Sequence, residues 1–222
     1  MKIYLIPGLG YDHRIFEKLS LRDVEVEYLN WIEPRKQEAI GEYAFRLFAN
    51  VPEGEDIVLI GHSLGGIVAQ EIAAKRKIKK IILLSSVKSR AEIPTFFKAI
   101  KPLGLYRLLT STISQKTVKY WGPQHGFSST EGQELFKSMV GRHSNTYLQW
   151  ALKALSGWTC PELPSTTWVF QIHGTDDQTF PFGLIEDADV VIEDGTHVMV
   201  YTEPKKVEKA LLGLIGNYGT TK

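Results

Sequence analysis

The sequence predicts an α/β fold in which a doubly wound, mostly parallel sheet of six strands carries a helical insertion. Short apolar runs alternate with segments whose apolar residues recur at helical spacing, which is the pattern of parallel strands joined by crossover helices. Some runs, such as 57–60, are apolar at every position, and this indicates strands covered on both faces. The 222 residues are enough for one domain with one sizeable core.

The individual elements follow from the spacing of apolar residues. The second expected strand alternates apolar and acidic residues, which is typical of a strand near a sheet edge. Helices are expected where apolar residues fall at positions i, i+3, i+4, i+7 and i+8, because this spacing buries one face. The expected strands are 2–6, 24–30, 57–60, 81–84, 168–172 and 190–192, and the expected helices are 11–19, 40–48, the segment after Ser63, and 207–215.

A long segment between the fourth and fifth expected strands has no strong strand pattern. It carries helical patches instead, at 96–109 and 135–158. We therefore expect a core of residues 1–87 and 166–222, with a helical cap, 88–165, inserted into it. Aromatic residues of the cap are candidates for an apolar pocket lining, although most are expected to form its own core: Phe96, Phe97, Tyr106, Trp121, Tyr147, Trp150 and Trp158.

Composition and charge exclude several classes of protein. The formal net charge is +1, which suggests neither a nucleic-acid nor a membrane partner. No apolar run approaches the roughly 20 residues that span a bilayer, and no signal peptide is recognisable at the start. Cys160 is the single cysteine, so an intramolecular disulfide is impossible. We expect a reducing, cytoplasmic location.

No metal ion or cofactor is expected. Histidines and carboxylates are scattered along the chain rather than paired at the spacing of metal ligands. The glycines at 61–66 are followed by Ile67 and Val68, and not by the lysine of a phosphate-binding loop.

The most informative motif is Gly61-His-Ser63-Leu-Gly65, which matches G-x-S-x-G. The pattern alone is weak, because the glycine and serine content produces one such match by chance in roughly one case in ten. Its context is specific: a covered strand leads into it and an amphipathic helix leaves it. A sharp strand-to-helix turn of this kind exposes a serine Oγ, and small residues are needed where strand and helix backbones approach. The alternative is an ordinary glycine-rich turn.

A serine nucleophile needs a base, and that base needs an orienting acid. His197 follows the last expected strand, so it shares with Ser63 the edge formed by the carboxyl ends of the strands. His62 adjoins Ser63 but is expected to point away from its Oγ. The remaining histidines have weaker positions: His13, His125, His143 and His173.

The acid is expected in the loop after the fifth strand, which reaches the same edge. Asp176 and Asp177 are both available there, and either could instead cap the turn. The oxyanion of an acyl-transfer intermediate needs N–H donors already in place. We expect the backbone N–H groups of Leu64, at the helix start, and of Leu9, in the turn after the first strand.

These motifs resemble those of the α/β-hydrolase superfamily, in particular small esterases and lipases, over most of the chain. The resemblance rests on the elbow at 61–66, the acid loop at 173–181 and Gly195-Thr-His197 with the downstream Glu203-Pro204. It implies a catalytic triad of Ser63, Asp177 and His197, since the family's acid stands three residues after the loop glycine. It also implies that 88–165 is a cap domain.

The sequence departs from the family pattern in three places. The oxyanion turn begins Pro7-Gly8 rather than His-Gly, which changes the hydrogen bonds around the donor. The first two strands of the full family sheet are absent, which leaves a reduced six-stranded core. About twenty residues separate Asp177 from His197, which is too few for the usual helix.

The expected function is that of a serine hydrolase acting on a carboxylic ester or related acyl compound, small and apolar, through a Ser-His-Asp triad and an acyl-enzyme. A first alternative is that the same triad performs thioester hydrolysis, acyl transfer, perhydrolysis or lyase chemistry, because one fold hosts many reactions. A second is a receptor-like, ligand-binding protein with a vestigial triad.

Overall fold

The computed structural model describes residues 1–21, 24–52 and 56–216. Within them six strands form one sheet in the order β2-β1-β3-β4-β5-β6, and every neighbouring pair is parallel. This confirms the predicted sheet, with the acidic second strand at one edge. The strands are β1 (Lys2–Ile6), β2 (Glu25–Tyr28), β3 (Ile57–His62), β4 (Lys80–Leu84), β5 (Trp168–Gly174) and β6 (Val190–Ile192).

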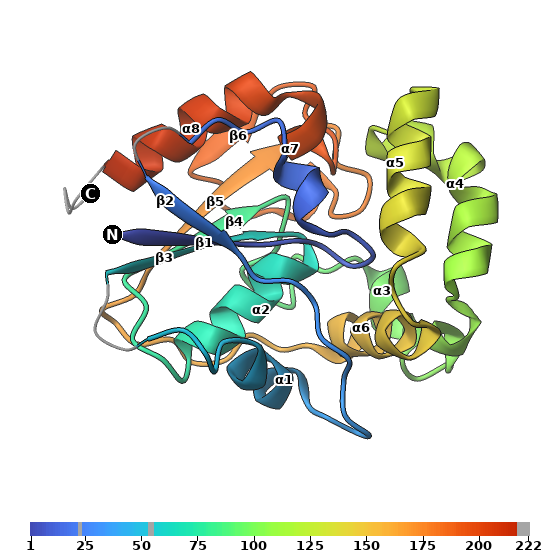
Figure 1. The fold of residues 1–222 in the computed structure, drawn as a ribbon, viewed down its shortest axis with the longest axis horizontal. Helices are drawn as coiled ribbons and strands as arrows, with labels where there is room; N and C mark the ends of the chain where they lie inside the picture. The colour runs from blue at the N-terminus through green and yellow to red at the C-terminus, as the bar shows by residue number, and fades with distance from the viewer. Residues whose placement is uncertain (22–23, 53–55, 217–222) are drawn as a thin grey trace.

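Helices cover both faces of the sheet (Figure 1). Helices α1 (Ile40–Leu47) and α2 (Leu64–Ala73) pack together on one face, while α8 (Pro204–Gly216) lies on the other. The short helix α7 (Met199–Thr202) packs against α8 and against a 3-10 helix, η1 (His13–Phe16). All ten residues of α2 are buried, so the helix that leaves Ser63 is enclosed by the protein.

The apolar strand residues alternate between two cores, one on each face. On β1, Ile3 and Leu5 belong to the core that also contains residues of α8. The intervening Tyr4 and Ile6 belong to the core that contains residues of α1. Successive side chains of a strand point to opposite faces, so a strand must be apolar at every position when both faces are covered.

The winding of the sheet reverses at β1, because β2 lies on one side of it and β3 to β6 lie on the other. In open α/β sheets, ligands bind in the crevice outside the carboxyl ends of the strands at such a reversal. The turn at 7–10 follows β1 and the turn at Ser63 follows β3, so both open into this crevice.

The chain between β4 and β5 is helical, as predicted, and lies beyond the carboxyl ends of the strands (Figure 1). Its apolar side chains join the core on the α8 side of the sheet. The exact division into a core and a cap at 88–165 stays a prediction. Across the described ranges no helix is long and apolar enough to cross a membrane. The elements are α3 (Thr95–Ile100), η2 (Leu105–Leu108), α4 (Ser111–His125), α5 (Thr130–Val140) and α6 (Asn145–Gly157).

The structure differs from the expected elements in three places. The helix expected over 11–19 is the single 3-10 turn η1, and the helical patch that extends to Leu109 ends in another 3-10 turn, η2. Helix α4 was not predicted, because its apolar residues are few and it contains Pro123. Its ends are nevertheless capped, by the Thr110 side chain, which accepts from the Ile113 N–H at 3.1 Å, and by Gly126 with a φ of 106°.

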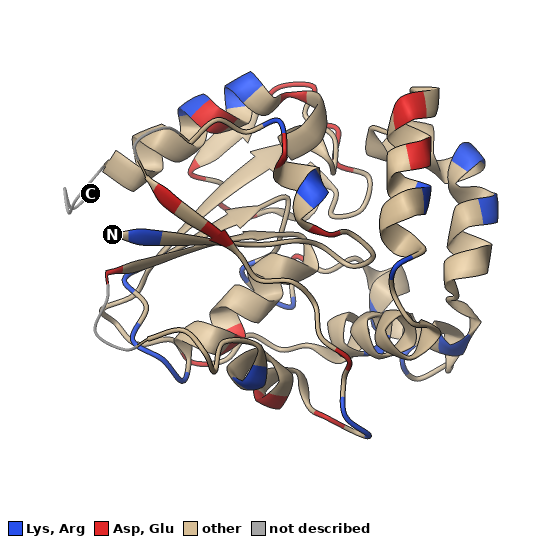
Figure 2. Ribbon diagram, viewed as in Figure 1, with Lys and Arg blue, Asp and Glu red and all other residues tan. Residues whose placement is uncertain are grey.

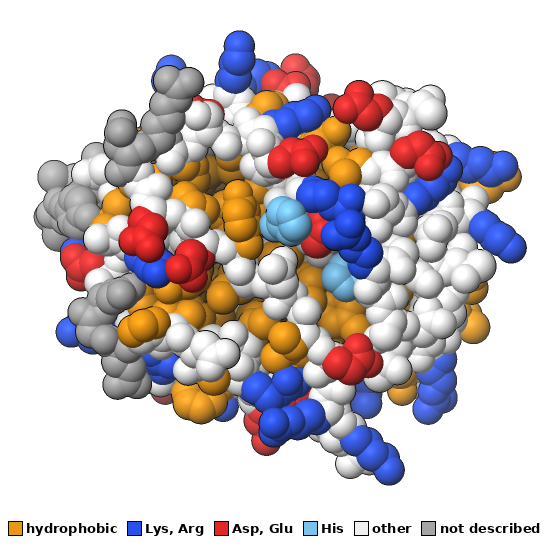
Figure 3. Space-filling model, in the orientation of Figure 1, with side chains coloured by type: hydrophobic (Ala, Val, Ile, Leu, Met, Phe, Trp, Pro, Cys, Tyr) orange, Lys and Arg blue, Asp and Glu red, His pale blue; other side chains and the backbone are white. Residues whose placement is uncertain are grey.

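The edge strand β2 is protected by charge. Lys2 on β1 forms ion pairs with Glu25 at 3.1 Å and Glu27 at 2.6 Å. Figure 2 shows these acidic positions on β2 and the basic start of β1, while the inner strands are nearly free of charge. Apolar side chains surround charged ones on the face seen in Figure 3. Tyr28, the last residue of β2, is exposed. Charged side chains on an edge strand discourage pairing with another chain.

Strand β3 and helix α2 approach so closely that the glycines of the motif have no room for a side chain. A Cβ on Gly61 would overlap the backbone of Gly65 and Gly66. A Cβ on Gly65 would overlap the backbone carbonyls of Ile6 and Pro7, at the end of β1. The two motif glycines are therefore required by backbone packing around Ser63.

We predict that Gly65→Ala lowers the free energy of unfolding by about 3 kcal/mol or more, because rigid backbone on both sides must move. The matched control is Gly213→Ala in α8, where an added Cβ meets nothing within 4 Å. That change should be neutral or stabilise by up to about 1 kcal/mol. Thermal and urea unfolding measure both variants, and equal effects would contradict the packing argument.

Candidate active site

Ser63 lies in a strained turn between β3 and α2. Its φ of 53° and ψ of −122° are unfavourable for any residue other than glycine, and such strain is typical of functional sites. Two neighbours hold the turn: the Ser63 N–H donates to the Leu84 carbonyl at 3.0 Å, and the Ser86 hydroxyl donates to the Ser63 carbonyl at 2.6 Å. The backbone is thus fixed on both sides of the serine hydroxyl.

The structure brings Ser63, His197 and Asp177 into one line of hydrogen bonds. His197 Nε2 lies 3.0 Å from Ser63 Oγ, and His197 Nδ1 lies 2.8 Å from Asp177 Oδ2. All three side chains are at most 5% exposed. A carboxylate can only accept, so Nδ1 of His197 donates to Asp177 and Nε2 is left to accept the Ser63 proton.

Asp177 is kept ionised by its surroundings. Burial opposes ionisation, but the favourable electrostatic interaction and the hydrogen bond with His197 outweigh it, and the Asp177 pKa lies below its ordinary value. Backbone N–H groups of Thr179 and Phe180 also donate to Oδ1, at 2.8 and 2.9 Å. Hydrogen bonds to the charged form stabilise it. The neighbouring Asp176 is exposed and does not contact His197.

The acid loop, 173–181, and the loop that carries His197, 193–198, which we call the histidine loop, are in backbone contact. A Cβ on Gly174 would overlap Gly195, and the Asp176 N–H donates to the Gly195 carbonyl at 3.0 Å. The short connection from β5 to β6 contains one 3-10 turn, η3 (Phe182–Leu184), in place of a helix. The short connection between Asp177 and His197 is therefore long enough to bring the two side chains together without a helix.

His62 points away from Ser63 Oγ, as expected, and has a role that the motif alone did not reveal. Its Nε2 donates to the backbone carbonyl of His197 at 2.9 Å. The ring is fully buried, and among the described residues its Nδ1 has no hydrogen-bond partner. Burial lowers the His62 pKa to about 3, so the ring is neutral. His62 therefore ties the histidine loop to the serine turn without adding charge.

The turn after β1 packs directly on the serine turn. A Cβ on Gly8 would lie 3.0 Å from Ser63 Cβ. The Gly8 carbonyl accepts from Trp31 Nε1 at 3.0 Å and from the Tyr11 N–H at 3.1 Å. In a trans peptide the following N–H, that of Leu9, points the opposite way. Trp31 was not predicted as part of the site, because its contact depends on the path of the loop after β2.

The Leu9 and Leu64 N–H groups are the two donors expected to bind the oxyanion. Within the described residues neither donates a hydrogen bond to the protein, and Leu64 is the first residue of α2. The first N–H groups of a helix lack intrahelical partners and favour negative charge. None of the four other histidines is bonded to Ser63. His125, His143 and His173 bond to backbone carbonyls, and His13 lies 5.6 Å from Tyr28 between ring centroids. The Nε2 of His173 also lies 3.5 Å from Asp177 Oδ2, so this histidine is next to the acid.

The helical segment covers the site. The His125 carbonyl accepts from the Val198 N–H at 3.3 Å, which places the end of α4 on the histidine loop. Phe97 lies 5.9 Å from Phe180 between ring centroids, and Phe180 lies 5.6 Å from His197. Phe97, one of the aromatic residues expected in a pocket lining, is therefore separated from His197 by a single ring, that of Phe180.

The sequence matches the Alpha/beta hydrolase family over residues 3–210. The chain belongs to this family. Family membership, together with the six-stranded parallel sheet, supports hydrolase activity in general.

Several solved structures share this fold at low sequence identity. An esterase from Exiguobacterium antarcticum has a TM-score of 0.74 at 16% identity, covering 98% of this chain and 92% of that one. A hydrolase from Oleispira antarctica has a TM-score of 0.74 at 14% identity, covering 98% and 91%. A bromoperoxidase from Bacillus anthracis has a TM-score of 0.71 at 16% identity, covering 97% and 92%. No curated protein matches the sequence.

In the part of the chain that the structure describes, no three histidine, cysteine or acidic side chains are grouped so that they could hold a metal ion. Near Ser63, the buried groups Asp177 and His197 are already hydrogen-bonded to each other.

We predict that His62 makes the protein less stable as the pH falls. The unfolded chain binds a proton near pH 6.5, whereas the folded chain resists it until about pH 3. Stability from the neutral ring is therefore complete above pH 6.5 and declines below it, by about 1.4 kcal/mol per pH unit. Between pH 7 and pH 5, wild type should lose about 2 kcal/mol more than His62→Gln, which retains a donor but does not titrate. Urea unfolding at both values measures this, and equal losses would refute it.

Proposed function

We propose that this hydrolase-family protein is a serine hydrolase that acts on a carboxylic ester or a related acyl compound. The observation that carries the proposal is the line of hydrogen bonds from Ser63 through His197 to Asp177. A serine, a neutral imidazole and a buried carboxylate in this order form the arrangement that activates a hydroxyl at neutral pH.

In the first half of the reaction, Ser63 Oγ attacks the acyl carbon while His197 Nε2 takes its proton. Asp177 holds the imidazole in the required tautomer and stabilises the imidazolium. The N–H groups of Leu9 and Leu64 bind the oxyanion. The tetrahedral intermediate then breaks its bond to the leaving group, which receives the proton from His197, and an acyl-Ser63 ester remains.

In the second half, water replaces the leaving group. His197 Nε2 takes a proton from water as the water oxygen attacks the acyl carbon. The bond to Ser63 Oγ breaks, the serine recovers its proton from His197, and a carboxylic acid is released. The proton that Ser63 loses departs with the leaving group, and a proton taken from water restores the serine hydroxyl, so the three residues return to their starting state.

The substrate we propose is a small, apolar acyl compound. Phe180 lies beside His197, and Phe97 lies beside Phe180. Leu9 is packed against the apolar core on the same side. Ser63 is 5% exposed, and we propose that the helical segment 88–165 acts as a cap over it. We also propose the reducing, cytoplasmic location in which a free Cys160 would persist.

The same three residues could serve related acyl chemistry. The structural likeness to a bromoperoxidase makes perhydrolysis worth including beside thioester hydrolysis, acyl transfer and lyase reactions. A panel of matched oxygen esters and thioesters, each with and without peroxide, ranks these by kcat/KM. A receptor-like protein with a vestigial triad would fail to react with a fluorophosphonate probe.

We predict that Ser63→Ala abolishes both labelling by a fluorophosphonate and turnover of a short p-nitrophenyl ester, with kcat at least about 10⁴-fold lower. Ser165→Ala, at an exposed serine before β5, is the matched control and should behave as wild type. Unchanged turnover in the Ser63 variant would show that another group is the nucleophile.

We predict that Trp31→Phe lowers kcat about tenfold and leaves KM unchanged. The phenyl ring loses the N–H that holds the Gly8 carbonyl, so the Leu9 N–H is less well aimed at the oxyanion. Steady-state kinetics on the same ester measure the effect. Trp168→Phe, at a tryptophan 47% exposed on β5, is the control. A fall in thermal stability without a change in kcat would mean that Trp31 serves packing alone.

A further inference from the structure

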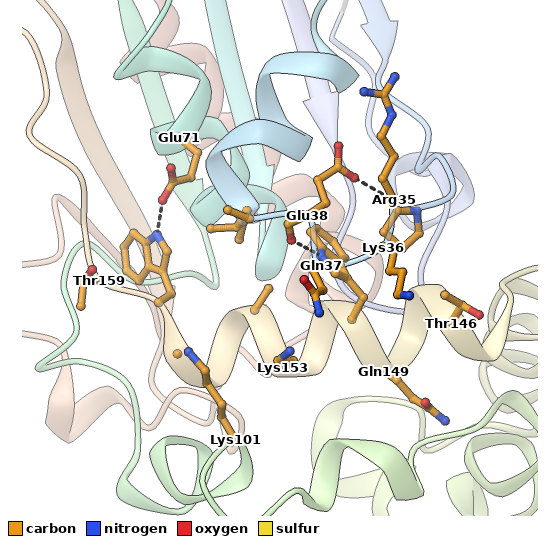
Figure 4. A pocket seen from close by; sticks show the side chains of 17 residues that line it. Arg35, Lys36, Gln37, Glu38, Glu71, Lys101, Thr146, Gln149, Lys153 and Thr159 are labelled. Carbon is orange, nitrogen blue, oxygen red and sulfur yellow. Dashed lines mark hydrogen bonds between the residues drawn. The ribbon is translucent and has the colours of Figure 1, made fainter.

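A second hollow lies on the outside of the molecule, between the loop 34–40 and helix α6 (Figure 4). Its volume is about 870 Å³, within the range of small-molecule sites, which is roughly 300–1,000 Å³. Neither the Ser63 site nor the turn at 7–10 contributes to its lining. We call this hollow the α6 groove.

Three lysines line the α6 groove: Lys36 from the loop, Lys153 from α6 and Lys101 from the end of α3. Figure 4 shows them spaced along α6, with Lys153 between the other two. All three are exposed, and in the described part of the chain none has a carboxylate oxygen within 4.0 Å. Three lysines, together with Arg35, thus line one hollow, and no carboxylate is paired with the lysines among the described residues.

The two carboxylates in the lining do not balance these lysines. Glu38 forms hydrogen bonds at 2.7 and 2.8 Å with the Arg46 guanidinium, and its Oε2 accepts from the Arg35 N–H at 2.8 Å. Glu71 accepts from Trp158 Nε1 at 2.8 Å, and burial raises the pKa of its carboxyl. The charge of Glu38 is therefore already paired with Arg46, and the raised pKa of Glu71 makes its charged form less favourable.

We propose that the α6 groove binds a phosphorylated small molecule with two or more negative charges, extended along α6. Lysine ammonium groups bind phosphate as point charges, and their spacing along the helix suits an elongated anion. The hydroxyls of Thr146 and Thr159 supply neutral hydrogen-bond groups in the same lining. The proposal does not depend on the chemistry of Ser63.

The test is calorimetric titration of the full chain at low ionic strength with inorganic pyrophosphate and with ADP. We expect saturable binding with one site, weaker at high salt. Lys101→Gln combined with Lys153→Gln should weaken it about tenfold or more, since two charges near the ligand are lost. The matched control is Lys205→Gln with Lys209→Gln, which removes the same charge from exposed positions on α8 and should bind as wild type.

A steric variant distinguishes binding inside the α6 groove from a general attraction of anions to the positive surface. Ala154→Trp fills the lining without changing charge and should also abolish binding. If ADP binds more tightly than pyrophosphate, the ligand is an organic phosphate. If the two bind equally, the groove recognises the phosphate groups alone. The proposal is overturned if neither ligand binds at about 10 mM, or if both lysine pairs matter equally. Ser63→Ala should bind normally, so this result stands apart from the proposed hydrolase reaction.

Discussion

The close contact of two backbones at the serine turn is the constraint on which the rest of the site depends. With glycine at 61 and 65, strand β3 and helix α2 approach far enough to hold Ser63 at a φ of 53°. The same contact seats the end of β1 against α2, because Gly65 lies on the carbonyls of Ile6 and Pro7. The turn that carries Leu9 is therefore brought beside Ser63 by the packing that creates the strain.

Around the serine turn, the site is held by hydrogen bonds between uncharged groups, and Asp177 carries its one buried charge. His62 ties the histidine loop to the serine turn while remaining uncharged, and Trp31 holds the Gly8 peptide through an indole N–H. Asp177 is the buried carboxylate, and it is stabilised by three groups that donate to it. A single buried charge with satisfied partners lets the imidazole gain a proton without a second charge opposing it.

The sequence was most informative where backbone geometry leaves little choice. Continuous apolar runs predicted inner strands such as β3 and β4, because both faces of the sheet are covered there. Alternation of apolar and acidic residues predicted β2, because it is an exposed edge strand. The spacing of glycines around Ser63 predicted the turn, because no other residue fits there. Helix α4 escaped prediction, since it depends on packing against α5 and on caps rather than on a strong apolar stripe. The roles of His62 and Trp31 require contacts between segments 135 and 23 residues apart, which no local pattern encodes.

The α6 groove and the serine site share a wall of aromatic rings. Trp150 lines the groove and lies 6.4 Å from Tyr147 between ring centroids, and Tyr147 lies 5.6 Å from Trp31. Trp31 in turn bonds to the Gly8 carbonyl. Densely packed rings leave few voids to absorb a displacement, so they pass it on to their neighbours. An anion that pulled α6 toward the loop 34–40 would shift this wall as a unit, so any influence of the groove on Ser63 would pass through the orientation of the Leu9 peptide.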